Sequence, residues 1–377
     1  MKKVICLCCA FIFIFNLNVS YAENKGVATS AKAVVLMEQS TKEVLLKNNE
    51  NERLPIASVT KIMTMLLIME AIDEGKISME DMVSVSQRAM SMGGSTMFLE
   101  EGEELSVYEM LKGIAVASAN DACVAMGEHI AGSEELFVEQ MNNKAKELGM
   151  ENTNFMNTNG LDTENHYSSA LDVAKMSAEL LKHEKIFEFT TIWTDTMHNG
   201  KFDLANTNKL IRFYQGANGL KTGSTNGALC CISATAKRNN MQLIAVVLGA
   251  PTSDDRFSDA KALLDYGFAN YEVENLVYKN DTICSVEVKK GNAEVVELVS
   301  SEDFSYLSIK GNKATINEEI LVSDYVNAPI KAGDKIGKII YYADDKKICQ
   351  IDLVAKSDVS KKSFGAYLLY IIKKFFG

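Results

Sequence analysis

The spacing of hydrophobic and polar positions changes along the chain, and it predicts which elements form. Residues 33–37 and 43–47 have strand character and flank the polar turn 39–42, so we expect a β-hairpin at the start of the first domain. Over residues 58–72 the apolar side chains recur at helical spacing. This pattern predicts a helix that buries one apolar face.

Helix caps mark further elements. Ser106 and Glu109 have the spacing of a capping box that opens a short helix, and Ser133 is expected to cap a helix that ends near Gly149. Beyond them the pattern predicts two helices, over about 170–182 and 256–270, and two apolar strands, over 228–236 and 242–248.

The pattern changes again near residue 275. Short alternating runs separated by Gly, Asn and Asp follow, which is typical of a small all-β domain of roughly 80 residues. The expected fold class is therefore mixed, with an α/β (α+β) domain over residues 23–273 and an all-β domain over 274–358. Residues 359–377 form a separate C-terminal segment.

The first 22 residues have the pattern of a targeting segment. Lys2 and Lys3, an apolar run over residues 4–15 and small residues up to Ala22 have the layout of a secretory signal peptide that is cleaved after residue 22. A non-cleaved N-terminal anchor is the alternative, since it would begin with the same run. Either reading predicts an exported protein.

The C-terminal segment combines apolar and basic residues. Its apolar stretch of about 14 residues is too short to span a membrane, which favours an amphipathic helix lying in the membrane surface. A helix packed on its own β domain is the alternative. The apolar residues at helical spacing are Phe364, Tyr367, Leu368, Ile371, Ile372, Phe375 and Phe376, flanked by Lys361, Lys362, Lys373 and Lys374.

Composition excludes several function classes. The formal net charge is −11, and loss of the signal peptide with its two lysines would take it to −13, which argues against nucleic acid as a partner. The four histidines show no ligand spacing, so we predict no metal and no cofactor. After cleavage an odd number of cysteines remains, which does not suggest a disulfide framework: Cys123, Cys230, Cys231, Cys284 and Cys349.

Three short motifs carry the candidate chemistry: Ser58-Val59-Thr60-Lys61, Ser118-Ala119-Asn120 and Lys221-Thr222-Gly223. An S-x-x-K tetrad alone is weak, because a second one occurs at Ser258 to Lys261. Only Ser58 is followed by the other two motifs, and it begins the predicted helix, where free N–H groups favour a developing negative charge.

Each residue type suits nucleophilic catalysis. A serine hydroxyl needs a base, and Lys61 would serve if burial or a neighbouring cation such as Lys221 kept it neutral. Lys221 is also a candidate for binding the substrate carboxylate. Ser118 would relay a proton to the leaving amine, and Asn120 would hold Lys61 and the substrate backbone. The backbone N–H groups of Ser58 and Ser224 would form an oxyanion hole.

The same segments resemble a known family. The stretch from Arg53 to Thr64, the run Ser118-Ala119-Asn120-Asp121-Ala122-Cys123 and the run Asn218-Gly219-Leu220-Lys221-Thr222-Gly223 are similar to those of the low-molecular-mass penicillin-binding proteins, the D-Ala-D-Ala carboxypeptidases. Gly160-Leu161-Asp162 with His166-Tyr167-Ser168, and the run 206–210, resemble further segments of that family. The resemblance covers roughly residues 27–358, although Asn157-Thr158-Asn159 departs from the common pattern.

The resemblance implies a β-lactamase/transpeptidase-like domain with an antiparallel sheet and a helical lobe, followed by a β domain. It implies an acyl-enzyme on Ser58, proton transfer by Lys61, a catalytic Ser118, and a structural role for His166. Asn120, Lys221, Thr222, Gly223 and Ser224 would bind substrate. The implied substrate is a peptidoglycan pentapeptide ending in D-Ala-D-Ala, with β-lactam antibiotics as inhibitors. The enzyme would sit on the outer face of the bacterial cytoplasmic membrane.

Two enzymes on the same fold and one non-enzyme remain as alternatives. A class A β-lactamase would need a deacylating glutamate in an E-x-x-L-N run, and none stands between Ser118 and Lys221. A D,D-endopeptidase that cuts crosslinks is the closer rival. A catalytically silent peptidoglycan-binding module fits poorly with three intact motifs.

Overall fold

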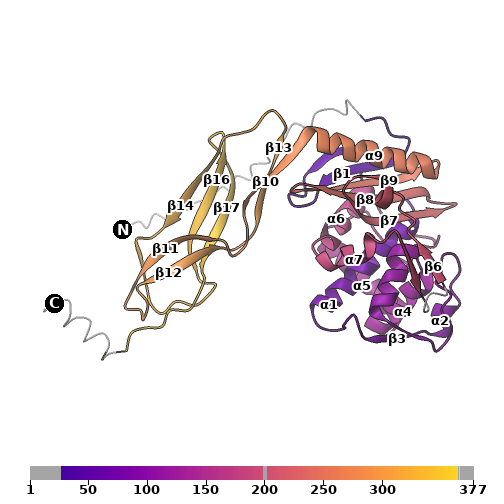
Figure 1. The fold of residues 1–377 in the computed structure, drawn as a ribbon, viewed down its shortest axis with the longest axis horizontal. Helices are drawn as coiled ribbons and strands as arrows, with labels where there is room; N and C mark the ends of the chain where they lie inside the picture. The colour runs from indigo at the N-terminus through magenta and orange to yellow at the C-terminus, as the bar shows by residue number, and fades with distance from the viewer. Residues whose placement is uncertain (1–26, 198–201, 364, 366–377) are drawn as a thin grey trace, which may run out of the picture.

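The computed structural model describes residues 27–197, 202–363 and 365. The expected signal peptide and most of the expected anchor segment, residues 364 and 366–377, lie outside these residues. Figure 1 shows two domains, which are called the first body and the β domain below. The first body combines helices and a sheet, and the β domain, coloured orange to yellow, lies at the C-terminal side. The mixed fold with an all-β C-terminal domain is as the sequence predicts.

A five-stranded antiparallel sheet forms the centre of the first body, with strand order β2-β1-β9-β8-β7. The predicted hairpin at the start of the domain is confirmed, because its two strands pair antiparallel. β9 lies in the middle and is buried along its whole length, whereas β7 is an edge strand. The strands are β1 (Ala33–Glu38), β2 (Val44–Asn48), β7 (Ala217–Thr225), β8 (Leu229–Arg238) and β9 (Met241–Ala250).

Helices cover both faces of this sheet (Figure 1). On one face α9 (Ser253–Asn270) packs on β8 and β9 through one apolar cluster, and on the other face a helical lobe packs through a larger cluster. The main helices of the lobe are α1 (Lys61–Asp73), α4 (Asn120–Ala131), α5 (Glu134–Glu147) and α6 (Ala170–Leu180).

Short elements complete the first body. They are the 3₁₀ turns η1 (Ala57–Thr60) and η3 (Glu184–Ile186), the π-helical turn η2 (Gly113–Ala117), the helices α2 (Gln87–Met90), α3 (Val107–Lys112), α7 (Phe187–Thr190) and α8 (Leu210–Phe213), and the strand pairs β3 (Met82–Ser84) with β4 (Glu104–Ser106) and β5 (Thr194–Met197) with β6 (Phe202–Ala205).

The sequence predicted the helix caps correctly, but it did not predict how fully α1 is buried. Ser106 Oγ accepts from Glu109 N at 3.2 Å and Ser133 Oγ accepts from Leu136 N at 3.2 Å, so both predicted caps are confirmed. The predicted single apolar face of α1 is wrong. Residues 61–69 are all buried, because α1 runs through the middle of the lobe with α4, α5 and α6 around it.

The β domain contains a six-stranded sheet and a two-stranded one. The larger sheet has the order β14-β16-β17-β12-β11-β15 and encloses its own apolar cluster, whereas β10 pairs with β13. β10 begins directly after α9, so the chain passes between the bodies without a linker. The strands are β10 (Tyr271–Val277), β11 (Thr282–Lys289), β12 (Val295–Ser300), β13 (Phe304–Ile309), β14 (Ile316–Val322), β15 (Tyr325–Asn327), β16 (Lys335–Ala343) and β17 (Lys346–Ala355).

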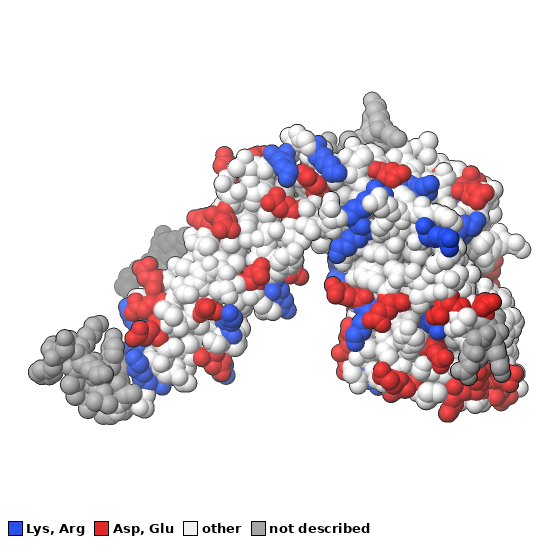
Figure 2. All heavy atoms as spheres, in the orientation of Figure 1, with Lys and Arg blue, Asp and Glu red and all other residues white. Residues whose placement is uncertain are grey.

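Charge and cysteine placement complete the description. On the face shown in Figure 2, Lys and Arg stand among Asp and Glu over both bodies, and the lower end of the helical lobe carries mostly acidic side chains. All five cysteines of the described residues are free thiols. Within the same residues, no helix is long and apolar enough to cross a membrane.

Candidate active site

Ser58 lies in the 3₁₀ turn that leads directly into α1. Its side chain is partly exposed, and its Oγ accepts a hydrogen bond from Lys61 Nζ at 2.9 Å. The preceding residue, Ala57, has φ +47°, in the left-handed region that residues with a Cβ rarely adopt. Such strain is typical of functional sites, and here it occurs in the turn that presents Ser58 beside its base.

Lys61 is fully buried and held by fixed acceptors. Its Nζ donates to Asn120 Oδ1 and to the backbone carbonyl oxygen of Asn159, each at 2.7 Å. Burial lowers the pKa of Lys61 from 10.5 to about 8, although the charges of Cys123 and Asp121 partly oppose this. The lowered pKa gives Lys61 a much larger neutral fraction near neutral pH than an exposed lysine has, which suits a base that must take the proton of Ser58.

The second motif lies between η2 and α4. Ser118 ends the π-helical turn with φ +62° and is buried, and within the described part of the chain its Oγ has no hydrogen-bond partner. Two residues later the amide of Asn120 bridges Lys61 and Gly93, with Nδ2 donating to the Gly93 carbonyl at 2.7 Å. The motif therefore combines a fixed amide with a hydroxyl that retains its bonding capacity.

The third motif lies on edge strand β7. The Lys221 side chain is only 1% exposed and donates to the Thr222 carbonyl at 3.2 Å. Burial is the main reason that the pKa of Lys221 lies well below 10.5, and the charge of Lys61 lowers it further. Thr222 Oγ1 donates to Thr207 Oγ1 at 2.6 Å, next to the same edge.

Gly223 brings β7 against the nucleophile turn. A Cβ at this position would lie 2.8 Å from both Ser58 N and the Ile56 carbonyl oxygen, so only glycine permits this approach. Ser224 follows on the strand and is exposed. The structure thus brings all three sequence motifs to one place, between the edge of the sheet and the helical lobe.

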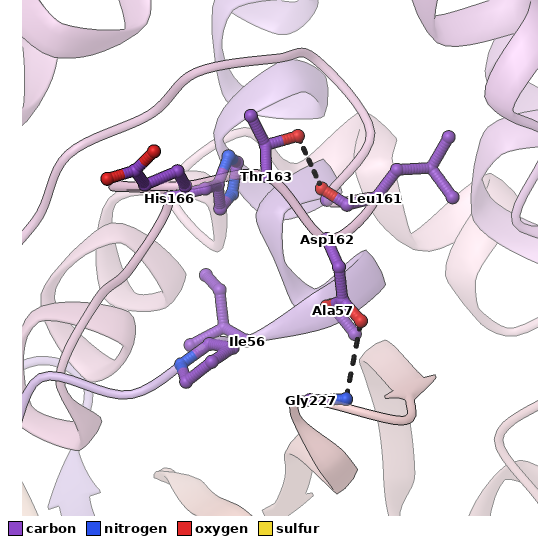
Figure 3. Close-up of a pocket in the computed structure, with 10 residues that line it drawn as sticks. Ile56, Ala57, Leu161, Asp162, Thr163, His166 and Gly227 are labelled. Carbon is purple, nitrogen blue, oxygen red and sulfur yellow. Dashed lines mark hydrogen bonds between the residues drawn. The ribbon is translucent and has the colours of Figure 1, made fainter.

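His166 stabilises the neighbouring loop. Its Nδ1 accepts from Met156 N at 3.1 Å, which leaves Nε2 to donate to Thr60 Oγ1 at 2.8 Å. Burial lowers the pKa of His166 to about 4, so the ring is neutral at physiological pH. Figure 3 shows this ring at the rim of a pocket formed by the loop.

Sequence reasoning missed one group of the site. The carbonyl oxygen of Asn159 accepts from Lys61, and a backbone acceptor has no sequence signal of its own. The next residue, Gly160, has φ +86°, and a Cβ there would overlap the Ala57 carbonyl, which fixes the loop against the nucleophile turn. No group of three or more potential metal-ligating side chains occurs in the described ranges.

Comparison with known proteins agrees with this arrangement. A family model described as D-alanyl-D-alanine carboxypeptidase matches residues 19–252, and one described as penicillin-binding protein 5, C-terminal domain, matches residues 271–361. A D-alanyl-D-alanine carboxypeptidase of Bacillus subtilis, DacF, is 49% identical over 93% of this chain and 92% of its own length.

Solved structures show the same likeness. Penicillin-binding protein 5 from Haemophilus influenzae superposes with a TM-score of 0.73 at 32% identity, over 89% of this chain and 99% of that one. Penicillin-binding protein D2 from Listeria monocytogenes, in an ampicillin-bound form, gives a TM-score of 0.59 at 32% identity, over 65% of this chain and 100% of that one.

Proposed function

The chain belongs to the D-alanyl-D-alanine carboxypeptidase family, and from this premise we propose that Ser58, Lys61 and Ser118 carry out its catalysis. The protein is a serine-type D-Ala-D-Ala carboxypeptidase with a penicillin-binding fold, and the β-lactamase and endopeptidase alternatives are not favoured. The observation that carries the assignment of residues is the short contact between a fully buried Lys61 amine and the Ser58 hydroxyl.

The proposed reaction forms and then breaks an ester. Ser58 Oγ attacks the carbonyl carbon between the two D-alanines while neutral Lys61 accepts its proton. Backbone N–H groups of Ser58 and Ser224 stabilise the oxyanion. Ser118, whose hydroxyl is not engaged elsewhere in the described residues, gives its proton to the leaving amine and takes in return the proton that Lys61 received from Ser58. Water then hydrolyses the acyl-enzyme and restores Ser58.

Lys221 has a separate role in this proposal, together with Thr222 and Gly223. The two buried amines cannot easily both be charged, because the charge of Lys61 lowers the pKa of Lys221. A substrate carboxylate beside Lys221 favours its protonated form. The positive charge so fixed keeps Lys61 neutral, and substrate binding would thereby prepare the base.

This function predicts that the acyl-enzyme formed from a peptide is hydrolysed quickly and that the one formed from penicillin is hydrolysed slowly. A peptide ending in D-Ala-D-Ala should release D-alanine with turnover, whereas penicillin should leave a long-lived adduct, because the chain has no E-x-x-L-N run to support fast deacylation. D-alanine release and the decay of a fluorescent penicillin adduct measure the two rates. The same peptide with an amidated C-terminus should react poorly if Lys221 binds the carboxylate. Rapid penicillin hydrolysis without D-alanine release would contradict the function.

We further propose that the enzyme is exported, loses residues 1–22, and attaches to the outer face of the cytoplasmic membrane through its C-terminal segment. The apolar and basic pattern of residues 361–377 supports the attachment. The β domain over residues 274–358 would then connect this segment to the peptidase domain over residues 23–273.

Removal of the C-terminal segment tests the attachment. A stop after Ser363 keeps the Gly291–Lys361 bridge and the bond from Lys362 N to the Lys290 carbonyl, so the β domain should fold normally. We expect this protein to be recovered in the soluble fraction with unchanged activity on a small peptide. A full-length Leu368→Glu, Ile371→Glu variant should behave in the same way. Sedimentation of the truncated protein with membranes would contradict the proposal.

A further inference from the structure

A cavity of about 300 Å³ lies between α8 and the first half of α9, outside the catalytic site. Its volume is at the lower end of the range of roughly 300–1,000 Å³ that is typical of ligand sites. Leu210 and Phe257 are buried and form its apolar floor, and Phe213 also lines it although 68% of this residue is exposed. The remaining lining residues are polar or charged: Lys209, Asp254, Ser258 and Lys261.

Phe213 connects the cavity to an exposed aromatic pair. Its ring packs edge-on against Trp193, with ring centroids 5.9 Å apart. The guanidinium of Arg212 lies over both rings, 5.7 Å from the centroid of Trp193 and 5.8 Å from that of Phe213. The turn of α8 produces this arrangement, because Leu210 and Tyr214, four residues apart, pack into the apolar cluster beneath α9. Arg212 and Phe213 are thereby left on the surface.

Positive charge collects here although the chain is acidic overall, with a formal net charge of −11. Lys209, Arg212 and Lys261 are cationic, and Asp254 is the one carboxylate among the described residues that line the cavity. Within the described part of the chain none of these three cations forms an ion pair, and Lys209 lies over the ring of Phe257 instead. Unpaired cations beside exposed rings favour an anionic ligand. The α8 surface, as it is called below, consists of Trp193, Lys209, Arg212, Phe213 and Lys261.

The α8 surface lies next to the end of β7 where the leaving D-alanine would be. The segment that leads into α8 contacts this strand twice. Thr222 Oγ1 donates to Thr207 Oγ1 at 2.6 Å, and Asn208 Nδ2 donates to the Gly219 carbonyl at 2.8 Å. The proposed substrate ends in a carboxylate at Lys221, so its own chain stops before it reaches α8. A ligand on the α8 surface is therefore a different segment of polymer from the stem that is being cut.

The position of the α8 surface favours a wall polymer over a lipid membrane. From Phe257 to the start of β10 at Tyr271, α9 runs for roughly 20 Å. The proposed membrane-attaching segment begins where Lys361 pairs with Gly291, next to β11 and β12. Figure 1 shows these two strands at the end of the β domain that is remote from α9. The α8 surface is thus separated from the proposed attachment point by α9 and by the β domain.

We propose that the α8 surface is a second, non-catalytic binding site for peptidoglycan, which holds a strand next to the one whose stem is being cut. Sugar rings have apolar C–H faces that pack on exposed aromatic rings, and the carboxylates of neighbouring stem peptides match the three cations. The proposal rests on the carboxypeptidase function above and adds to it a preference for polymeric over soluble substrate.

Binding to insoluble peptidoglycan tests the site apart from catalysis. The full chain is first acylated with penicillin, which blocks the catalytic site, and its binding to purified sacculi is measured by co-sedimentation. An Arg212→Glu, Phe213→Ala variant should bind about tenfold more weakly, because it reverses one charge and removes the exposed ring. Binding of the unmodified protein should weaken as salt is added. The matched control, Lys289→Glu with Tyr325→Ala, makes the same two kinds of change at a lysine–tyrosine pair of the β domain and should bind normally.

Activity on two substrates gives a second readout. The Arg212→Glu, Phe213→Ala variant should keep kcat/KM on a soluble pentapeptide ending in D-Ala-D-Ala within about twofold, as for surface substitutions away from a site. Its release of D-alanine from limiting sacculi should fall about tenfold, in step with the loss of binding. Thermal melting and the rate of acylation by penicillin check that the variant is folded.

The source of the negative charge is tested with hydrofluoric acid, which cleaves phosphodiesters and removes phosphate polymers from sacculi while the stem carboxylates remain. Binding should survive this treatment. Loss of binding to the treated sacculi, or equal binding by the variant and the unmodified protein, would overturn the second site and leave the carboxypeptidase function intact. Absence of D-alanine release from both the soluble peptide and the sacculi would overturn the two together.

Discussion

Replacing Ser58 with alanine should abolish both covalent labelling by penicillin and release of D-alanine. The hydroxyl is the only proposed nucleophile, and loss of a serine nucleophile typically reduces kcat on the order of 10⁶-fold. The fold should survive, because Ser58 is partly exposed and, among the residues that the structure describes, its side chain contributes only the bond from Lys61. Fluorescent penicillin on a denaturing gel and a D-alanine assay measure the two losses, and thermal melting checks the fold.

The chain supplies a matched control for this substitution. Ser258 heads the second S-x-x-K tetrad, but it is exposed on α9, on the opposite face of the sheet from the helical lobe. Ser258→Ala should therefore label and turn over substrate like the unmodified enzyme. Labelling that persists in Ser58→Ala and disappears in Ser258→Ala would reverse the assignment of the nucleophile.

The structure shows why the sequence predicted some parts well. Helix caps such as Ser106 and Ser133 act within four residues, so a local pattern is sufficient to find them. The three motifs likewise combine residues with a specific chemical use. Ser58 and Lys61 are only three positions apart in a turn that leads into a helix, which places their side chains on the same side and within reach of each other.

Other parts depend on tertiary packing that no local pattern reports. β7 is rich in Gly, Thr and Ser and lacks a clear alternation, yet it forms a strand because β8 pairs with it along its length. The burial of Lys221 follows from this pairing and from the neighbouring lobe, so its low pKa could not be read from sequence. The surroundings of α1 were mispredicted for the same reason, since the helix is enclosed on all sides.

Substitution of Lys61 should prevent acylation of Ser58. Arginine keeps the positive charge but cannot lose a proton, so Lys61→Arg lacks a base, and loss of general-base catalysis costs about 10²–10⁴-fold. Arginine is also larger than the fully buried lysine. Lys61→Met, which has a similar length and no charge, serves as the second variant. Both should fail to acylate while melting cooperatively.

The pH profile of the unmodified enzyme provides an independent test of the same role. The base must be neutral, and the pKa of Lys61 is about 8 because burial disfavours its charged form. Below pH 8 the protonated fraction grows, and the second-order rate constant for acylation by penicillin should fall about tenfold per pH unit. Above pH 8, where most of Lys61 is neutral, it should level off. Acylation that is independent of pH between 6 and 8, or a Lys61→Met variant that labels at the normal rate, would show that another group takes the proton of Ser58.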